Sequence, residues 1–273
     1  MWPVRALQLS DLHAGTSEEP EVEQDLRSLV RQIKPELVVV TGDLTHRNTR
    51  EQHERAARIL RSLERPLLVI PGNHDIPKLP PSRFTRTFDE FLRVWDETEP
   101  VYRSESLIVC GLNSVRPWKQ QGGALRSEQI DRVRRCFAEH RPAALRVVAL
   151  HHHLLGAPWR TAKRTIANRS SVLGSLVDAG AELIVSGHVH QGAVSERREF
   201  EVAHGRVRGT TVVTAPGLGQ PRPKRRGEAR GLHLFEADER SLRVVTWAWT
   251  GSDWCVIGER RFPRGTDALA CAL

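Results

Sequence analysis

Five short apolar runs, rich in β-branched residues, punctuate this chain, and each is followed almost at once by Gly, Asp, Asn or His. A run of this length that is apolar throughout is typical of a strand buried on both faces. Helical apolar spacing, as in Val22, Leu26 and Val30, separates several of the runs. The pattern therefore predicts an α/β fold. The runs are Val4–Leu9, Leu37–Val40, Leu67–Ile70, Val147–Leu150 and Leu183–Val185.

A short polar island follows each run. Side chains just past the carboxyl ends of buried strands can converge on one crevice. Carboxylate, imidazole and amide groups in one crevice are metal ligands, and a mixed N/O set without thiolate suits Mn, Fe or Zn better than Mg. The islands are Asp11-Leu12-His13, Gly42-Asp43, Gly72-Asn73-His74-Asp75, His151-His152-His153 and Gly187-His188-Val189-His190.

The islands differ in how specific they are. Asp11-x-His13 alone is weak, although alternation along an extended strand would place both side chains on one side. Gly42-Asp43 is equally common as a plain turn. The string Gly72-Asn73-His74-Asp75 is far more specific, since average residue usage produces it about once per thousand chains of this length. Of the three consecutive histidines 151–153, we expect one to be a ligand, and the sequence leaves open which.

The rest of the chain predicts further elements around these islands. A helix is expected over about Arg50–Leu63, another where Phe84, Phe88, Phe91, Leu92 and Trp95 repeat, and a hairpin near residues 101–112. After His190, successive strands without helices over 194–262 suggest an antiparallel or mixed sheet that closes the fold. No internal repeat or long linker interrupts residues 1–273, so we expect a single domain.

Composition limits the location and the partners of the protein. The chain has 273 residues, of which 39% are hydrophobic, and no apolar run reaches the length of a membrane span. The N-terminus enters its first strand at once, without a signal-like segment, so we expect a cytoplasmic protein. The net charge of +8 raises the possibility of nucleic-acid binding. Lysine is rare, however, and the excess of arginine is spread along the chain; whether the basic loop 221–230 binds a polyanion is left open.

Taken together and in this order, the islands resemble the calcineurin-like metallophosphoesterase superfamily, whose pattern is D-x-H, GD, GNH[D/E], H, GHxH. The resemblance covers residues 7–190 and is nearest to bacterial members related to class III cyclic-nucleotide phosphodiesterases. It implies a four-layer sandwich in which two mixed β-sheets pack face to face between α-helices. It also implies a cofactor of two divalent ions (Mn, Fe or Zn), bridged by a hydroxide that attacks phosphorus.

The same resemblance assigns roles to individual residues. One ion would be held by Asp11, His13, Asp43 and His190, and the other by Asp43, Asn73, His151 and His188. His74 would act as general acid or phosphate stabiliser, and Asp75 would orient His74. Where the family carries His-His-Pro, this chain has His151-His152-His153-Leu154. His152 therefore stays in reserve as a ligand or a substrate contact, and Asn113 is a second candidate for substrate binding.

Three functions are compatible with the sequence. The first is a dinuclear metal-dependent phosphodiesterase that acts on a small diester, such as a cyclic nucleotide or a glycerophosphodiester. The second is a metal-dependent nuclease acting on DNA or RNA, which the basic charge favours. The third is a non-catalytic interaction scaffold, which is disfavoured because every ligand position of the pattern is filled. The oligomeric state is not predicted.

Overall fold

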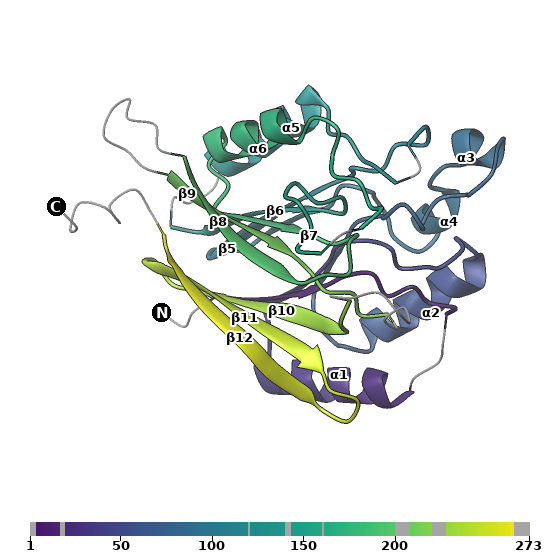
Figure 1. The fold of residues 1–273 in the computed structure, drawn as a ribbon, viewed down its shortest axis with the longest axis horizontal. Helices are drawn as coiled ribbons and strands as arrows, with labels where there is room; N and C mark the ends of the chain where they lie inside the picture. Colours follow the sequence, from purple (N-terminus) through teal and green to yellow (C-terminus); the bar gives the residue numbers. More distant parts are fainter. Residues whose placement is uncertain are drawn as a thin grey trace.

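Two six-stranded sheets lie at the centre of the molecule (Figure 1). The computed structural model describes residues 4–16, 20–119, 121–139, 143–159, 161–199, 208–219 and 228–264. The first sheet has the order β12-β11-β10-β1-β2-β3 and the second β4-β5-β6-β7-β9-β8. Both sheets are mixed. In the first, β1, β2 and β3 pair in parallel, whereas β10, β11 and β12 pair in antiparallel fashion. In the second, β5, β6, β7 and β9 pair in parallel, whereas the edge strands β4 and β8 are antiparallel to their neighbours. The strands are β1 (Val4–Leu9), β2 (Leu37–Val40), β3 (Leu67–Val69), β4 (Val101–Arg103), β5 (Leu107–Leu112), β6 (Leu145–Leu150), β7 (Leu183–Ser186), β8 (Ala193–Glu199), β9 (Arg208–Thr214), β10 (Gly231–Ala237), β11 (Ser241–Trp249) and β12 (Trp254–Pro263).

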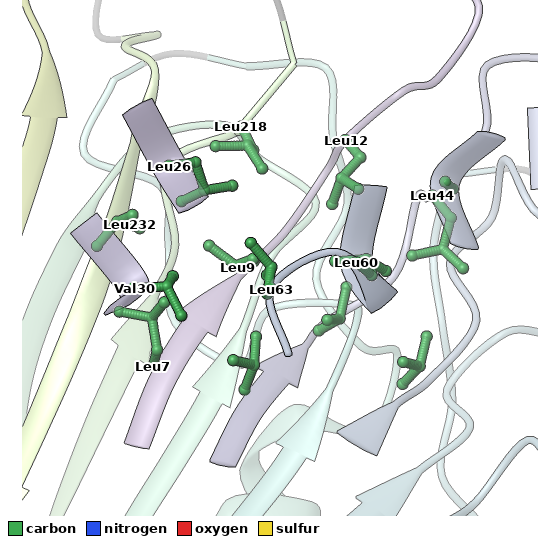
Figure 2. Packing of buried hydrophobic residues seen from close by; sticks show 14 of the residues in the cluster. Leu7, Leu9, Leu12, Leu26, Val30, Leu44, Leu60, Leu63, Leu218 and Leu232 are labelled. Carbon is green, nitrogen blue, oxygen red and sulfur yellow. The ribbon is translucent and has the colours of Figure 1, made fainter. Parts of the chain in front are cut away.

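Helices cover the outer faces of both sheets, which gives four layers. The helices α1 (Pro20–Ile33) and α2 (Arg50–Arg61) lie on the first sheet, and α5 (Ser127–Ala138) and α6 (Arg169–Asp178) lie on the second (Figure 1). Alternation along each strand builds the layers. In β1, Leu7 and Leu9 pack against Leu26 and Leu60 of the helices, as Figure 2 shows, whereas Ala6 lies in the core between the sheets. The predicted four-layer sandwich is confirmed.

The predicted helix around residues 84–95 is wrong. The chain forms two single turns there, α3 (Ser82–Thr85) and α4 (Asp89–Leu92), and only Phe91 of the apolar stripe is fully buried. Arg83 takes the inward position instead, because its guanidinium donates hydrogen bonds to the carbonyls of Pro77, Pro117 and Lys119. Loop carbonyls shielded from water need such partners, and this requirement outweighs the apolar periodicity.

The strand-rich closing segment is shared between the two sheets. The strands β8 and β9 complete the second sheet, whereas β10, β11 and β12 complete the first. The core between the sheets joins strands from both halves of the sequence, which supports our proposal of one domain over residues 1–273. Most of the basic loop 221–230 lies outside the described residues. Within the described part of the chain, no helix is long and apolar enough to span a membrane.

Candidate metal centre

The five islands meet at one place, where loops from both sheets come together. The loops after β1, β2 and β3 bring residues 10–16, 41–49 and 70–77, and those after β6 and β7 bring residues 151–154 and 187–191. The loops are tied by backbone hydrogen bonds, from Asp11 N to Gly42 O at 2.9 Å, from His13 N to Asp43 O at 3.0 Å and from Gly187 N to His151 O at 3.0 Å. Strands that are distant in sequence therefore deliver their polar ends to one cluster.

Left-handed backbone conformations aim the ligand side chains. We expected Asp11 and His13 to alternate along an extended strand, but β1 ends at Leu9 and both residues have positive φ. Non-glycine residues rarely adopt this conformation, which costs on the order of 1 kcal/mol or more and concentrates at functional sites. The predicted ligands in this conformation are Asp11 (φ 53°), His13 (φ 49°), Asp43 (φ 52°), His188 (φ 76°) and His190 (φ 59°).

Two of the island glycines are required by close approach. A Cβ on Gly72 would overlap both the backbone nitrogen and the Oδ1 atom of Asp43. A Cβ on Gly187 would overlap Ser10 Oγ and lie 2.6 Å from Asp11 Oδ2. The carboxylates of Asp43 and Asp11 therefore sit against bare backbone, which explains why glycine opens these two islands.

The first group of potential ligands consists of Asp11, His13, Asp43 and His190, all buried, with one ligand atom from each within 4.8 Å of the others. His190 Nε2 lies 3.1 Å from Asp11 Oδ1 and 3.0 Å from His13 Nε2. His13 Nε2 is also 3.8 Å from Asp43 Oδ2. The family resemblance grouped these four residues around one ion, and the structure brings all four together.

The second group consists of Asp43, His151 and His188, and it shares Asp43 with the first. His151 Nε2 lies 3.3 Å from Asp43 Oδ1 and 3.1 Å from Asn73 Oδ1. Asn73 thus adds an amide oxygen to this group. Among the three consecutive histidines, His151 is the one that joins it.

For His151 and His188, a hydrogen bond on the far side of the ring decides which nitrogen faces the cluster. His151 Nδ1 donates to Thr41 O at 2.7 Å, which leaves Nε2 directed at Asp43. His188 Nε2 donates to Gln121 O at 3.0 Å, which leaves Nδ1 as its ligand atom. Backbone carbonyls that fix the tautomer of a metal-binding imidazole in this way are a common feature of metal sites.

The donor set fits two divalent cations. Asp43 Oδ2 and His188 Nδ1 are buried, and neither has a hydrogen-bond partner among the described residues. A buried carboxylate oxygen without a partner is costly unless a cation accompanies it. Imidazole, carboxylate and amide ligands around a shared carboxylate suit two first-row divalent ions.

Charges within the cluster shift the ionisation of its members. Burial by itself would lower the pKa of His151, but the adjacent Asp43 carboxylate outweighs it and raises the pKa to about 9. Burial would raise the pKa of Asp43, yet His151 and His74 hold it well below its usual range. Burial lowers the pKa of His13 to about 3, in spite of Asp43 and Asp11. The low pKa values favour an ionised Asp43 and a neutral His13, the forms in which they bind metals, whereas the raised pKa of His151 favours a proton that metal binding would release.

His74 and Asp75 lie beside the shared carboxylate in different roles. The backbone nitrogen of His74 donates to Asp43 Oδ1 at 2.8 Å, and its ring Nδ1 donates to His46 O at 2.9 Å.

The expectation that the Asp75 carboxylate orients the His74 ring is wrong. Both carboxylate oxygens of Asp75 accept hydrogen bonds from the loops, from Leu44 N, Thr45 N and Gly72 N, and a backbone carbonyl orients His74 instead. Asp75 holds the two loops together.

His152 and Asn113 lie next to the cluster without joining either ligand group. His152 is fully buried and its Nδ1 pairs with Ser114 Oγ at 2.8 Å. Asn113 is buried too, and its Oδ1 accepts a hydrogen bond from Val115 N at 3.0 Å within its own turn. Their role in substrate binding stays a prediction.

Sequence reasoning missed the residues that support the site from outside the islands. Thr41 and Gln121 act through backbone carbonyls, which no motif records. Glu228, whose Oε2 lies 3.9 Å from His190 Nδ1, comes from a segment with no pattern of its own. His46 was missed too. It follows Asp43 by three residues, and this short separation was the one feature of the sequence that could have placed it at the site.

Comparisons with known proteins agree with this geometry. The sequence model of the family described as calcineurin-like phosphoesterase matches residues 4–192. The chain is 24% identical over 219 residues to the 3',5'-cyclic adenosine monophosphate phosphodiesterase CpdA of Haemophilus influenzae, a match that covers 73% of this chain and 74% of that protein. It is 27% identical over 181 residues to the serine/threonine-protein phosphatase CPPED1 of Pongo abelii, covering 59% of this chain and 55% of the relative.

Solved structures show the same architecture. The purple acid phosphatase PPD1 of yellow lupin superposes with a TM-score of 0.70 at 13% identity, over 96% of this chain and 54% of that chain. At this identity the likeness concerns the fold alone. The chain spans about half the length of CPPED1 and of the lupin protein, and about three quarters of CpdA.

Proposed function

Because the chain belongs to the calcineurin-like phosphoesterase family and is a metal-dependent phosphoesterase, we propose that it hydrolyses a small phosphodiester at a centre of two divalent ions. The observation that carries this proposal is the position of Asp43. Its two carboxylate oxygens face two different groups of buried ligands. A shared carboxylate is what holds two ions close enough to act on one phosphoryl group.

In this proposal the ligands divide as the groups do. Asp11, His13 and His190 hold one ion together with Asp43. Asn73, His151 and His188 complete the other. When bound, the two ions supply charge compensation for the phosphoryl oxygens and a deprotonated water as nucleophile.

His74 is the protein group proposed to move a proton. Its Nδ1 faces the carbonyl of His46, so Nδ1 carries a hydrogen in either charge state. Nε2 is then the atom that can donate to, or take a proton from, an oxygen of the substrate. His74 is also less buried than the ligands around it, in keeping with a position at the mouth of the site.

The choice of a diester rests on the relatives. CpdA is a phosphodiesterase by name, and further relatives are named as cyclic nucleotide and glycerophosphodiester phosphodiesterases. CPPED1, in contrast, is named as a phosphatase. A diester substrate with a small alcohol or nucleoside group is therefore our proposal for this chain.

The test begins with protein that has been stripped by a chelator. Mn²⁺, Fe²⁺ or Zn²⁺ is added back, and hydrolysis of bis-p-nitrophenyl phosphate, p-nitrophenyl phosphate and 3',5'-cyclic AMP is compared. We expect Mn²⁺ to restore diesterase activity, and we expect diesters to exceed the monoester in kcat/KM. Full activity of an Asn73→Ala variant, or no hydrolysis with any metal, would contradict the proposal.

A further inference from the structure

A second imidazole, that of His46, lies beside His74 at the centre. The two rings are stacked, with centroids 5.8 Å apart and an interplanar angle of 26°. The His46 ring also meets the His13 ring edge-on at 6.1 Å. One ring nitrogen from each of the three histidines lies within 4.8 Å of the other two. His46 and His74 are both half-buried, whereas His13 is buried.

The backbone fixes the position of His46 independently of its side chain. The His46 nitrogen donates to Ala14 O at 3.1 Å, and its carbonyl accepts from His74 Nδ1 at 2.9 Å. The preceding residue, Thr45, donates its nitrogen and hydroxyl to Asp75 Oδ1, each at 2.9 Å. The backbone of residue 46 is thus held beside His74 by a loop that is anchored on both sides.

We propose that His46 is a second substrate-facing imidazole, which donates an N–H to a phosphoryl oxygen next to the one that His74 contacts. This inference rests on the proposed function. A hydrogen-bonded oxygen lies about 2.9 Å from its donor. Two donor nitrogens separated by up to about twice that distance, about 5.8 Å, can therefore both donate to the same phosphoryl group. The spacing of the ring nitrogens satisfies that limit. A neutral imidazole always carries one N–H, so the role requires no change of charge.

A third cation bound by His13, His46 and His74 is the alternative use of the same geometry. It is disfavoured because this group contains no carboxylate, whereas both of the other groups contain Asp43. His13 also belongs to the first ligand group, so a third ion would lie beside two others without compensating charge. An anionic phosphoryl group meets the opposite situation, since the two cations of the proposed centre would attract it.

The test compares His46→Ala with His46→Gln and with Arg50→Ala. Both substitutions of His46 keep the carbonyl that orients His74, and glutamine keeps an N–H donor. Arg50→Ala is the control, because it removes an exposed side chain a few residues away that pairs with the exposed Glu54. Binding of inorganic phosphate to the Mn²⁺-loaded proteins is measured by calorimetry, together with metal content and the kinetics on bis-p-nitrophenyl phosphate.

We expect His46→Ala to bind phosphate about ten- to hundredfold more weakly and to lose a similar factor in kcat/KM, with its metal content unchanged. His46→Gln should recover most of the loss, and Arg50→Ala should match the wild type. Unchanged phosphate affinity in His46→Ala would overturn the inference, and so would the loss of a metal equivalent. Phosphate binding is read separately from turnover, so failure of the wild type to hydrolyse diesters would count against the proposed function alone.

Discussion

At the scale of single residues, the centre depends most on Asp43, the one carboxylate shared by both ligand groups. We predict that Asp43→Asn lowers the metal content below two ions per chain and reduces diester hydrolysis by at least about a hundredfold. The amide keeps the shape but removes the charge that both ions of the proposed centre would require. Metal analysis after dialysis, together with the rate on bis-p-nitrophenyl phosphate, measures both effects.

Asp131→Asn is the matched control for Asp43→Asn. Asp131 is an exposed carboxylate that pairs with the exposed Arg134 on α5, and such surface pairs contribute little. The control should keep both metal and activity. If Asp43→Asn kept two ions per chain, the shared-carboxylate proposal would be lost.

The close approach of Gly72 to Asp43 leads to a second prediction at the residue scale. In Gly72→Ala the new methyl group must displace Asp43, so we expect metal affinity to fall about ten- to hundredfold. Gly156→Ala adds the same methyl group where nothing lies within 4 Å, and it should leave metal affinity unchanged. Titration of the apo proteins with Mn²⁺ compares the pair, and equal affinities would show that Asp43 tolerates the shift.

The sequence predicted the ligands far better than it predicted how they are held. The resemblance to a known family, carried by the type and order of the island residues, grouped Asp11 with His13 and His190. The left-handed conformations were not predictable, since they are uncommon for any residue other than glycine, even for Asp and His, which adopt them more often than most. The roles of the Thr41 and His46 carbonyls, which accept hydrogen bonds from His151 and His74, were not predictable either. Every residue has a backbone acceptor, so the sequence does not indicate which ones are used.

At the scale of elements, the strands followed from sequence and the segment 84–95 did not. A strand buried on both faces has only apolar side chains, so its record in the sequence is unambiguous, as in Leu37–Val40. Residues 82–92 meet two different surroundings, because Arg83 satisfies three loop carbonyls whereas Phe91 packs in the core beside α2. Helical periodicity assumes one apolar surface beneath the whole segment, and the polar surroundings of Arg83 interrupt it.

A polar contact between the sheets predicts how stability depends on pH. His233 of β10 is buried, and its Nε2 donates to Thr214 O of β9 in the other sheet at 3.2 Å. Burial lowers the pKa of His233 to about 4. As pH falls from about 6.5 towards 4, His233 binds a proton in the unfolded chain but stays neutral in the folded chain. The free energy of unfolding therefore decreases.

We therefore expect His233→Gln to lose less stability than the wild type on acidification. The Thr246 hydroxyl lies 3.1 Å from His233 Nδ1, so glutamine can donate to Thr214 and accept from Thr246, but it has no titrating proton. Urea unfolding at pH 7.5 and pH 5 should differ between the two proteins by about 2 kcal/mol in the change of unfolding free energy. Parallel changes in both proteins would assign the acid sensitivity to other groups, such as His13, whose pKa also lies low.

At the scale of the whole molecule, the net charge of +8 suggests binding of a polyanion, but many of the arginine side chains behind it are already engaged within the fold. Many arginines are paired with glutamates along the sheets and helices, as Arg5 is with Glu236 and Arg264 is with Glu182. Others are buried on loop carbonyls, as Arg83 and Arg116 are. Guanidinium groups engaged in this way have fewer donors left for phosphates, although the excess of positive charge itself is unchanged.

Salt dependence separates a small-diester enzyme from a nuclease. A protein that contacts six to ten phosphates loses about 10³- to 10⁵-fold in affinity between 50 and 200 mM salt. A substrate with one phosphoryl group held at the metal centre has no such counterions to release. We predict that kcat/KM for bis-p-nitrophenyl phosphate changes by less than about threefold over this range, and that single-stranded DNA competes poorly even at low salt. Strong inhibition by DNA at 50 mM salt that disappears at 200 mM would favour the nuclease, because a polyanion would then occupy the mouth beside His74.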